Sequence, residues 1–199
     1  MKRSLAALAA FALIASAASP ALASWKLVDA GARITVAKSL LTVTPGHDWN
    51  RWTIRPIKKG EVWTLDGTAI NELYFVTGLA PGETLFRDVN KKERPLPALG
   101  SSVQLTDIPE FVESSTRIAF NTSVFELTDV QPATVAGHQG VRFTYEYAVE
   151  GTPVTRKGLA AGTIVDGKLY LIAYTAPAVY FFDRDAPKVE AIIASASLS

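Results

Sequence analysis

The sequence predicts an α+β fold in which an antiparallel β-sheet is covered by helices. Residues 34–77 contain short runs rich in β-branched and aromatic side chains, separated by Gly and Pro, which is typical of strands joined by turns. Residues 141–149 alternate strictly between apolar and other side chains, which indicates a strand with one buried face. Two segments with helical periodicity, near residues 108–117 and 183–193, supply the covering helices.

The first 23 residues have the features of a secretory signal peptide. A positively charged start, Lys2-Arg3, precedes an apolar run over residues 5–18, and Ala21-Leu22-Ala23 has the small-x-small form of a cleavage site. We therefore expect cleavage between Ala23 and Ser24, and a periplasmic or secreted protein. No later apolar run approaches the ~20 residues of a membrane-spanning helix, so we expect no stable membrane anchor after cleavage.

Residues 24–199 are expected to form a single globular α+β domain, since their length suffices for one core. Without the two basic residues of the leader, 18 basic residues stand against 19 acidic ones. This balance lacks the basic excess that a phosphate backbone requires, so we expect no nucleic-acid partner. The chain has no cysteine, which excludes thiol catalysis, thiolate metal ligands and a lipid-modified cysteine.

The first part of the expected domain is rich in strands. We predict them at residues 34–43, 49–54, 61–65 and 72–77. The pair Asp66-Gly67 favours a two-residue type I′ turn, so the third strand should fold back on the segment that follows. Residues 80–100 contain several Pro and Gly breakers and are predicted to form an exposed connection, with an active-site lid as the alternative.

A helix is predicted to begin at Thr106 or Asp107, either of which can cap it, and to run to about Arg117. Its expected buried face carries Ile108, Phe111, Val112 and Ser115. A further strand is predicted at residues 123–127. Pro132 and the glycine-rich stretch 136–140 are predicted to form the connection that follows it.

The chain then predicts an antiparallel meander of strands at residues 141–149, 154–165 and 168–175, joined by turns at Glu150-Gly151 and Asp166-Gly167. The middle strand carries a stripe of small residues, 158–162, where we expect a helix to approach closely, with a ligand groove as the alternative. A final helix should be capped by Asp183 or Asp185, with Pro187 near its first turn. Its buried stripe is expected to contain Val189, Ile192 and Ile193.

Residues 158–198 read GLAAGTIVDGKLYLIAYTAPAVYFFDRDAPKVEAIIASASL. They predict, in this order, a strand, an Asp-Gly turn, a second strand, an aromatic-proline link and a helix. This order resembles the Mog1/PsbP-like α/β/α sandwich group over roughly residues 105–198. The resemblance implies an antiparallel sheet covered by helices. It also implies an accessory, assembly or partner-binding role, because members of the group are mostly not enzymes and supply no catalytic residues to transfer.

Few residues are candidates for catalysis. His47 precedes Asp48, and a histidine oriented by a carboxylate can act as a general base, although Pro45-Gly46 also predicts a plain surface turn. His138 lies in a predicted hairpin corner. The histidine spacing of zinc sites and the Gly-x-Ser-x-Gly elbow of serine hydrolases do not occur, so we expect no metal and no cofactor. A glycosidase-like carboxylate pair remains open among Asp66, Glu72, Asp129, Glu146 and Asp183.

Aromatic residues are the candidates for binding. Trp49, Trp52 and Trp63 fall on neighbouring predicted strands, and such side chains serve either a core or a platform for sugars, peptides or lipids. Because Trp49 and Trp52 are three residues apart, a regular strand directs them to opposite faces. A pocket between sheet and helix is expected to draw on these tryptophans or on four tyrosines: Tyr145, Tyr147, Tyr170 and Tyr174.

Together these observations predict an exported envelope protein that binds a protein partner or supports assembly without catalysing a reaction. Two alternatives stay open. One is a protein that binds a small apolar ligand or a glycan in the aromatic pocket. The other is a hydrolase that uses His47 and Asp48.

Overall fold

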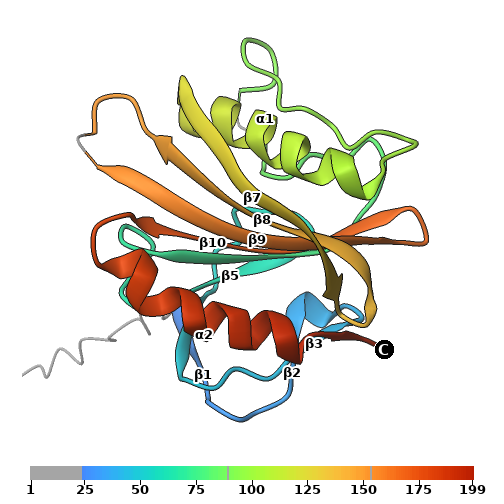
Figure 1. The fold of residues 1–199 in the computed structure, drawn as a ribbon, viewed down its shortest axis with the longest axis vertical. Helices are drawn as coiled ribbons and strands as arrows, with labels where there is room; N and C mark the ends of the chain where they lie inside the picture. Colours follow the sequence, from blue (N-terminus) through green and yellow to red (C-terminus); the bar gives the residue numbers. More distant parts are fainter. Residues whose placement is uncertain (1–23, 89, 153) are drawn as a thin grey trace, which may run out of the picture.

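An eight-stranded antiparallel sheet forms the centre of the molecule in the computed structural model, which describes residues 24–88, 90–152 and 154–199. Helix α1 (Ile108–Phe120) covers one face and helix α2 (Phe181–Ser195) covers the other (Figure 1). The strands follow in the spatial order β1 (Trp25–Val28), β4 (Trp49–Trp52), β5 (Gly60–Thr64), β6 (Glu72–Leu79), β10 (Lys168–Pro177), β9 (Thr155–Val165), β8 (His138–Ala148) and β7 (Val124–Val135). The predicted α+β sandwich is confirmed, whereas the predicted leader lies outside the described residues.

A second, three-stranded sheet consists of β11 (Ser197–Leu198), β3 (Leu41–Val43) and β2 (Ile34–Thr35) and lies on the α2 side (Figure 1). The prediction of one strand over residues 34–43 is wrong. A short 3₁₀ segment, η1 (Val36–Lys38), divides it, because Ala37 and Lys38 have φ angles of 52° and 57° that no strand accommodates. Another 3₁₀ turn, η2 (Leu105–Asp107), leads into α1.

Each face of the large sheet has its own hydrophobic core, because successive side chains of a strand point to opposite faces. The α2-side core contains Trp49, Trp63, Phe75 and Tyr174 together with the predicted helix stripe Val189, Ile192 and Ile193. The α1-side core contains Val62, Phe143 and Tyr145, together with Ile108, Phe111 and Val112 from α1.

The meander of β8, β9 and β10 is confirmed. Its Asp166-Gly167 corner has φ angles of 51° and 69°, as a type I′ turn requires. The small residues of β9 make room for two close contacts. A Cβ atom built on Gly162 would lie 3.2 Å from Ile108 of α1, which confirms the expected close approach of a helix. One built on Gly158 would lie 2.0 Å from Cζ of Tyr145, so the absence of a side chain there makes room for that ring.

Other predicted boundaries are wrong for identifiable reasons. Helix α1 continues to Phe120, where Asn121 ends it in a left-handed conformation. Pro132 lies inside β7 and not in a connection, because β7 is an edge strand and needs no N–H donor on its free side. Helix α2 begins at Phe181 and its N-cap is Tyr180, so neither Asp183 nor Asp185 caps it, and Asp185 and Pro187 are interior residues of the helix.

The described residues of the predicted connection, 80–88 and 90–100, are only partly exposed. Leu85 and Leu99 are buried, and a bridge joins Thr84 to Ala98. This segment therefore folds against the α1-side core. Within the described ranges, no helix is long and apolar enough to cross a membrane.

Candidate functional site

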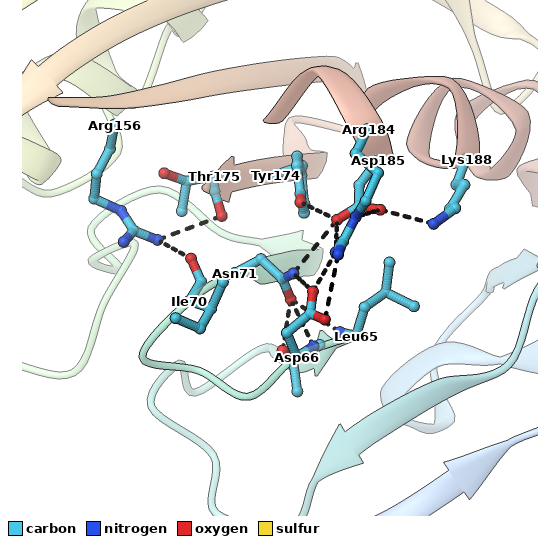
Figure 2. A network of polar contacts seen from close by, with 11 residues as sticks. Leu65, Asp66, Ile70, Asn71, Arg156, Tyr174, Thr175, Arg184, Asp185 and Lys188 are labelled. Carbon is cyan, nitrogen blue, oxygen red and sulfur yellow. Dashed lines mark hydrogen bonds and ion pairs between the residues drawn. The ribbon is translucent and has the colours of Figure 1, made fainter. Parts of the chain in front are cut away.

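A buried carboxylate, Asp185, organises the N-terminal part of α2 (Figure 2). Its Oδ1 accepts hydrogen bonds from Nε of Arg184 at 2.9 Å and Nζ of Lys188 at 2.7 Å. Its Oδ2 accepts one from the hydroxyl of Tyr174 at 3.1 Å. A buried carboxylate is tolerated only when charge and hydrogen bonds compensate it, and here two cations and a phenol do so.

The same group of residues holds the connection between β5 and β6. Oδ1 of Asn71 accepts from the hydroxyl of Thr64 at 2.6 Å and from the backbone N–H of Leu65 at 2.9 Å. Its amide donates to Asp66 at 2.6 Å, and Asp66 in turn forms an ion pair with Arg184 (Figure 2). We refer to Asp66, Asn71, Tyr174, Arg184, Asp185 and Lys188 as the Asp185 network.

This arrangement explains why the predicted type I′ turn at Asp66-Gly67 is wrong. Residues 65–71 form a longer connection in which only Gly67, at φ 96°, has a positive φ. The Asn71 side chain replaces the short turn by satisfying backbone groups across the loop, as asparagine side chains do in turns. The pairing of β5 with β6 nevertheless follows the prediction.

The pKa shifts in the Asp185 network indicate a structural role, in which the network holds parts of the fold together. Burial raises the pKa of Asp185, but the hydrogen bonds from Arg184 and Lys188 outweigh it, so the net pKa lies below its usual value. Burial and the neighbouring carboxylate both raise the pKa of Tyr174, which keeps this phenol a neutral donor. The network therefore joins α2 to the β5–β6 connection with compensated charges.

A second cluster lies on the opposite face, beneath α1. Tyr74, Tyr145 and Tyr147 line a largely enclosed apolar cavity together with Phe86 and Phe120. The rings form a chain of contacts, with centroids 5.0 Å to 6.1 Å apart from Phe86 through Phe120 to Tyr147, Tyr145 and Phe125. The cavity measures about 20 Å³, which is room for one water molecule. It is therefore a filled core region in this conformation.

A carboxyl group, Glu72, lies at the margin of this tyrosine cluster and accepts a hydrogen bond from Tyr74. Burial raises its pKa, while the Tyr74 hydrogen bond and the nearby Arg156 oppose the rise. Arg156 donates to the backbone oxygen of Ile70 at 3.0 Å (Figure 2). The folded state consequently favours the protonated form of Glu72 more than the unfolded chain does.

The raised pKa of Glu72 predicts a pH-dependent stability difference. The folded state binds a proton more tightly here than the unfolded chain, so the wild type loses stability as pH rises through the interval above the ordinary value of 4.5. We expect Glu72→Gln, which keeps an acceptor for Tyr74, to gain stability relative to the wild type between pH 4 and pH 7. Urea unfolding of both proteins at pH 4 and at pH 7 measures this gain. A stability difference that is the same at both pH values, or that changes in the opposite direction, contradicts the raised pKa of Glu72.

The predicted catalytic residues lie in an exposed turn between β3 and β4. His47 and Asp48 are both exposed, and Oδ1 of Asp48 accepts from the backbone N–H of Ala30 at 2.8 Å. Among the described residues, no hydrogen bond joins His47 to a carboxylate. Three of the five carboxylates considered for a glycosidase pair are engaged separately, since Asp66, Asp129 and Glu146 form ion pairs with Arg184, Arg142 and Lys157 respectively. Across the described ranges, no cluster of His, Asp and Glu suited to a metal ion occurs.

The predicted binding aromatics are divided between the two faces. Trp49 and Trp63 are buried in the α2-side core, while Trp52 packs against the α1-side core. Tyr170 and Tyr174 also face α2, whereas Tyr145 and Tyr147 face α1. One pocket cannot draw on all four tyrosines, because the sheet separates the two pairs.

A third feature was missed from the sequence: an exposed apolar corner between β10 and α2. Val179 is 81% exposed and Tyr180 is 64% exposed. Tyr180 has φ 71° and ψ −57°, and the N–H of Phe181 donates to the carbonyl of Val179 at 2.9 Å, which defines a γ-turn. Such a conformation is strained for a residue with a side chain, and strained residues concentrate at functional sites.

Neighbouring residues fix this corner in place. The guanidinium carbon of Arg184 lies 5.5 Å from the ring centroid of Tyr180, within the range of a cation–π contact. The N–H of Ala178 donates to the carbonyl of Thr155 at 2.9 Å, which brings the start of β9 and the exposed Val154 next to the corner. We refer to Val154, Val179 and Tyr180 as the corner patch. The aromatic run 179–182 was the only signal for it in the sequence.

Comparison with known proteins identifies the fold. No protein-family model matches the chain, and no curated protein sequence matches it. Among solved structures, LpqN, involved in cell envelope biogenesis of Mycobacterium tuberculosis, matches 89% of this chain and 79% of its own at 10% identity and a TM-score of 0.36. Cyanobacterial PsbP (CyanoP) from Synechocystis sp. PCC 6803 matches 94% of this chain and 99% of its own at 16% identity and a TM-score of 0.53. The chain therefore has a PsbP-like fold, as the resemblance over roughly residues 105–198 implied.

Proposed function

We propose that the protein is an exported accessory domain of the cell envelope that binds a protein partner through the corner patch. The observation that carries the proposal is the strained, exposed Tyr180. A large aromatic side chain held in a fixed direction can bind with little further loss of conformational entropy, and tyrosine is enriched among residues that dominate binding energy. The leader-like N-terminus, and the mostly accessory roles of the group that the sequence resembles, support the location and the non-catalytic role.

Capture from an envelope extract tests this proposal. The immobilised domain should retain a protein that Tyr180→Phe also retains and Tyr180→Ala retains at least tenfold less, because alanine removes the ring and phenylalanine keeps it. Val130→Ala, an exposed apolar change on β7, is the matched control and should retain the protein fully. If the retained proteins are the same for Tyr180→Ala and the wild type, the corner patch is not the binding surface.

Tyr180→Gly separates strain from binding. Glycine adopts positive φ without the steric cost that tyrosine bears, so we expect this variant to unfold with a free energy about 1 kcal/mol higher than the wild type. It should at the same time lose the partner as Tyr180→Ala does. Thermal or urea unfolding measures the first effect. A variant that is less stable than the wild type shows that Tyr180 has a structural role in place of the proposed one.

A further inference from the structure

An open groove lies at the β1 end of the large sheet, away from the tyrosine cluster. Its volume is about 430 Å³, and its lining residues are Trp25, Asn50, Thr64, Leu65, Asp66 and Gly67. Asn50 is paired with Thr64 between β4 and β5, so the floor of the groove is made by neighbouring strands. Trp25 from β1 and the β5–β6 connection form its walls.

The aromatic wall is exposed and firmly supported. Trp25 is 38% exposed, and its ring is stacked on Trp52, its cross-strand partner, with centroids 6.1 Å apart and planes inclined by 19°. Trp52 is in turn packed against the α1-side core. A tryptophan backed in this way presents a flat apolar surface whose orientation is set before a ligand arrives.

The opposite wall is polar and equally well held. Asp66 is fixed by Asn71 and Arg184 of the Asp185 network (Figure 2). A third of its side chain nevertheless remains accessible, which leaves carboxylate lone pairs for a ligand. Asn50 is exposed, and its amide has no hydrogen-bond partner among the described residues. An amide and a carboxylate together offer both donors and acceptors.

This combination selects a chemical class of ligand. A pyranose ring has a face of C–H groups that stacks on an indole and a rim of hydroxyls that both donate and accept hydrogen bonds. The six lining residues include one carboxylate and no Lys or Arg, which disfavours phosphate and other anions. A purely apolar ligand would leave Asn50 and Asp66 without hydrogen bonds after removing them from water.

We propose that the groove between Trp25 and Asp66 binds a neutral saccharide, with one pyranose ring stacked on Trp25 and its hydroxyls bonded to Asn50 and Asp66. The proposal does not depend on the corner patch. Arg184 contacts both Asp66 and Tyr180, so variants that separate the two functions have to be placed on Trp25 or Asn50.

The test is a screen of the mature chain on an array of neutral oligosaccharides, followed by titration of a retained oligosaccharide by calorimetry. We expect saturable binding that weakens at least tenfold in Trp25→Ala and in Asn50→Ala. Leu27→Ala is the matched control, because Leu27 is exposed on the same strand but does not line the groove, and it should bind as the wild type does. Trp25→Tyr should retain part of the affinity because it keeps a stacking surface.

Several outcomes would overturn the proposal. One is an array on which the wild type is retained no better than Trp25→Ala. Another is binding restricted to acidic saccharides and abolished by 0.5 M salt, since the groove lining supplies no cation for them. Asn50→Ala guards against a folding artefact, because its side chain is exposed and its thermal unfolding should match that of the wild type. Partner capture through Tyr180 should be unchanged in both groove variants.

Discussion

Asp185→Asn is expected to lower the free energy of unfolding by about 3 kcal/mol at pH 7. The variant leaves Arg184 and Lys188 without their shared counter-charge at a fully buried position, and removing one partner of a buried ion pair typically costs about 3–5 kcal/mol. The two cations are partly exposed, so we take the low end of this range. For a domain of this size the loss corresponds to a fall in Tm of about 6–12 °C.

The direction of the pKa shift of Asp185 determines how the effect of Asp185→Asn depends on pH. The pKa of Asp185 is lowered in the folded state, so its stabilising contribution is complete above the ordinary value of 3.8 and is lost as pH falls through the folded-state value. The difference between wild type and Asp185→Asn should therefore shrink in acid. Asp183→Asn is the control. Asp183 is an exposed carboxylate in the same helical turn, and we expect its substitution to lower the free energy of unfolding by less than about 1 kcal/mol. Equal losses of stability in Asp185→Asn and Asp183→Asn would contradict a stabilising role of the Asp185 network.

Gly158→Ala is expected to cost about 3 kcal/mol. The added Cβ would lie 2.0 Å from Cζ of Tyr145, so the ring has to leave its site and disturb the stacked aromatics beneath α1. Gly46→Ala is the matched control, since nothing lies within 4 Å of a Cβ at that position, and it should change stability by less than about 0.5 kcal/mol.

A double-mutant cycle identifies the cause of the Gly158 effect. If the clash with the ring is responsible, the combination of Gly158→Ala with Tyr145→Ala should cost at least about 1 kcal/mol less than the sum of the single changes. Urea unfolding of the four proteins provides the values. Strict additivity would show that the glycine is required for a reason other than the Tyr145 ring.

The outcome for the two Asp-Gly pairs shows how far local sequence determines this fold. Asp166-Gly167 forms the expected tight turn because the strands on both sides continue directly into it. Asp66-Gly67 has the same residues, but the Asn71 side chain accepts hydrogen bonds from the backbone of this loop. In addition, Arg184, on a helix more than a hundred residues away, donates a hydrogen bond to Asp66. The contact of Arg184 with Asp66 spans 118 residues and is not visible in a local pattern, so the Asp-Gly motif alone could not show that the tight turn is replaced.

The candidate sites were harder to predict than the strands for a related reason. Strict alternation in β8 correctly predicted which residues are buried, but not that Tyr145 and Tyr147 face α1 while Tyr170 and Tyr174 face α2. That division depends on the register between strands. The strained conformation of Tyr180 has no signature in a single sequence, because it is imposed by the elements that flank it. The stacking of Trp25 on Trp52 likewise depends on the pairing of β1 with β4.

The most direct test of the central claim is site-specific photocrosslinking in cells that express the full chain. A photoreactive residue in place of Val179 should give a discrete adduct with an envelope protein, whereas the same residue in place of the exposed Thr134 on β7 should not. The adduct should weaken strongly when Tyr180→Ala is added. Identical adducts from both positions, or an adduct that Tyr180→Ala leaves unchanged, would contradict an exported domain that binds its partner through the corner patch.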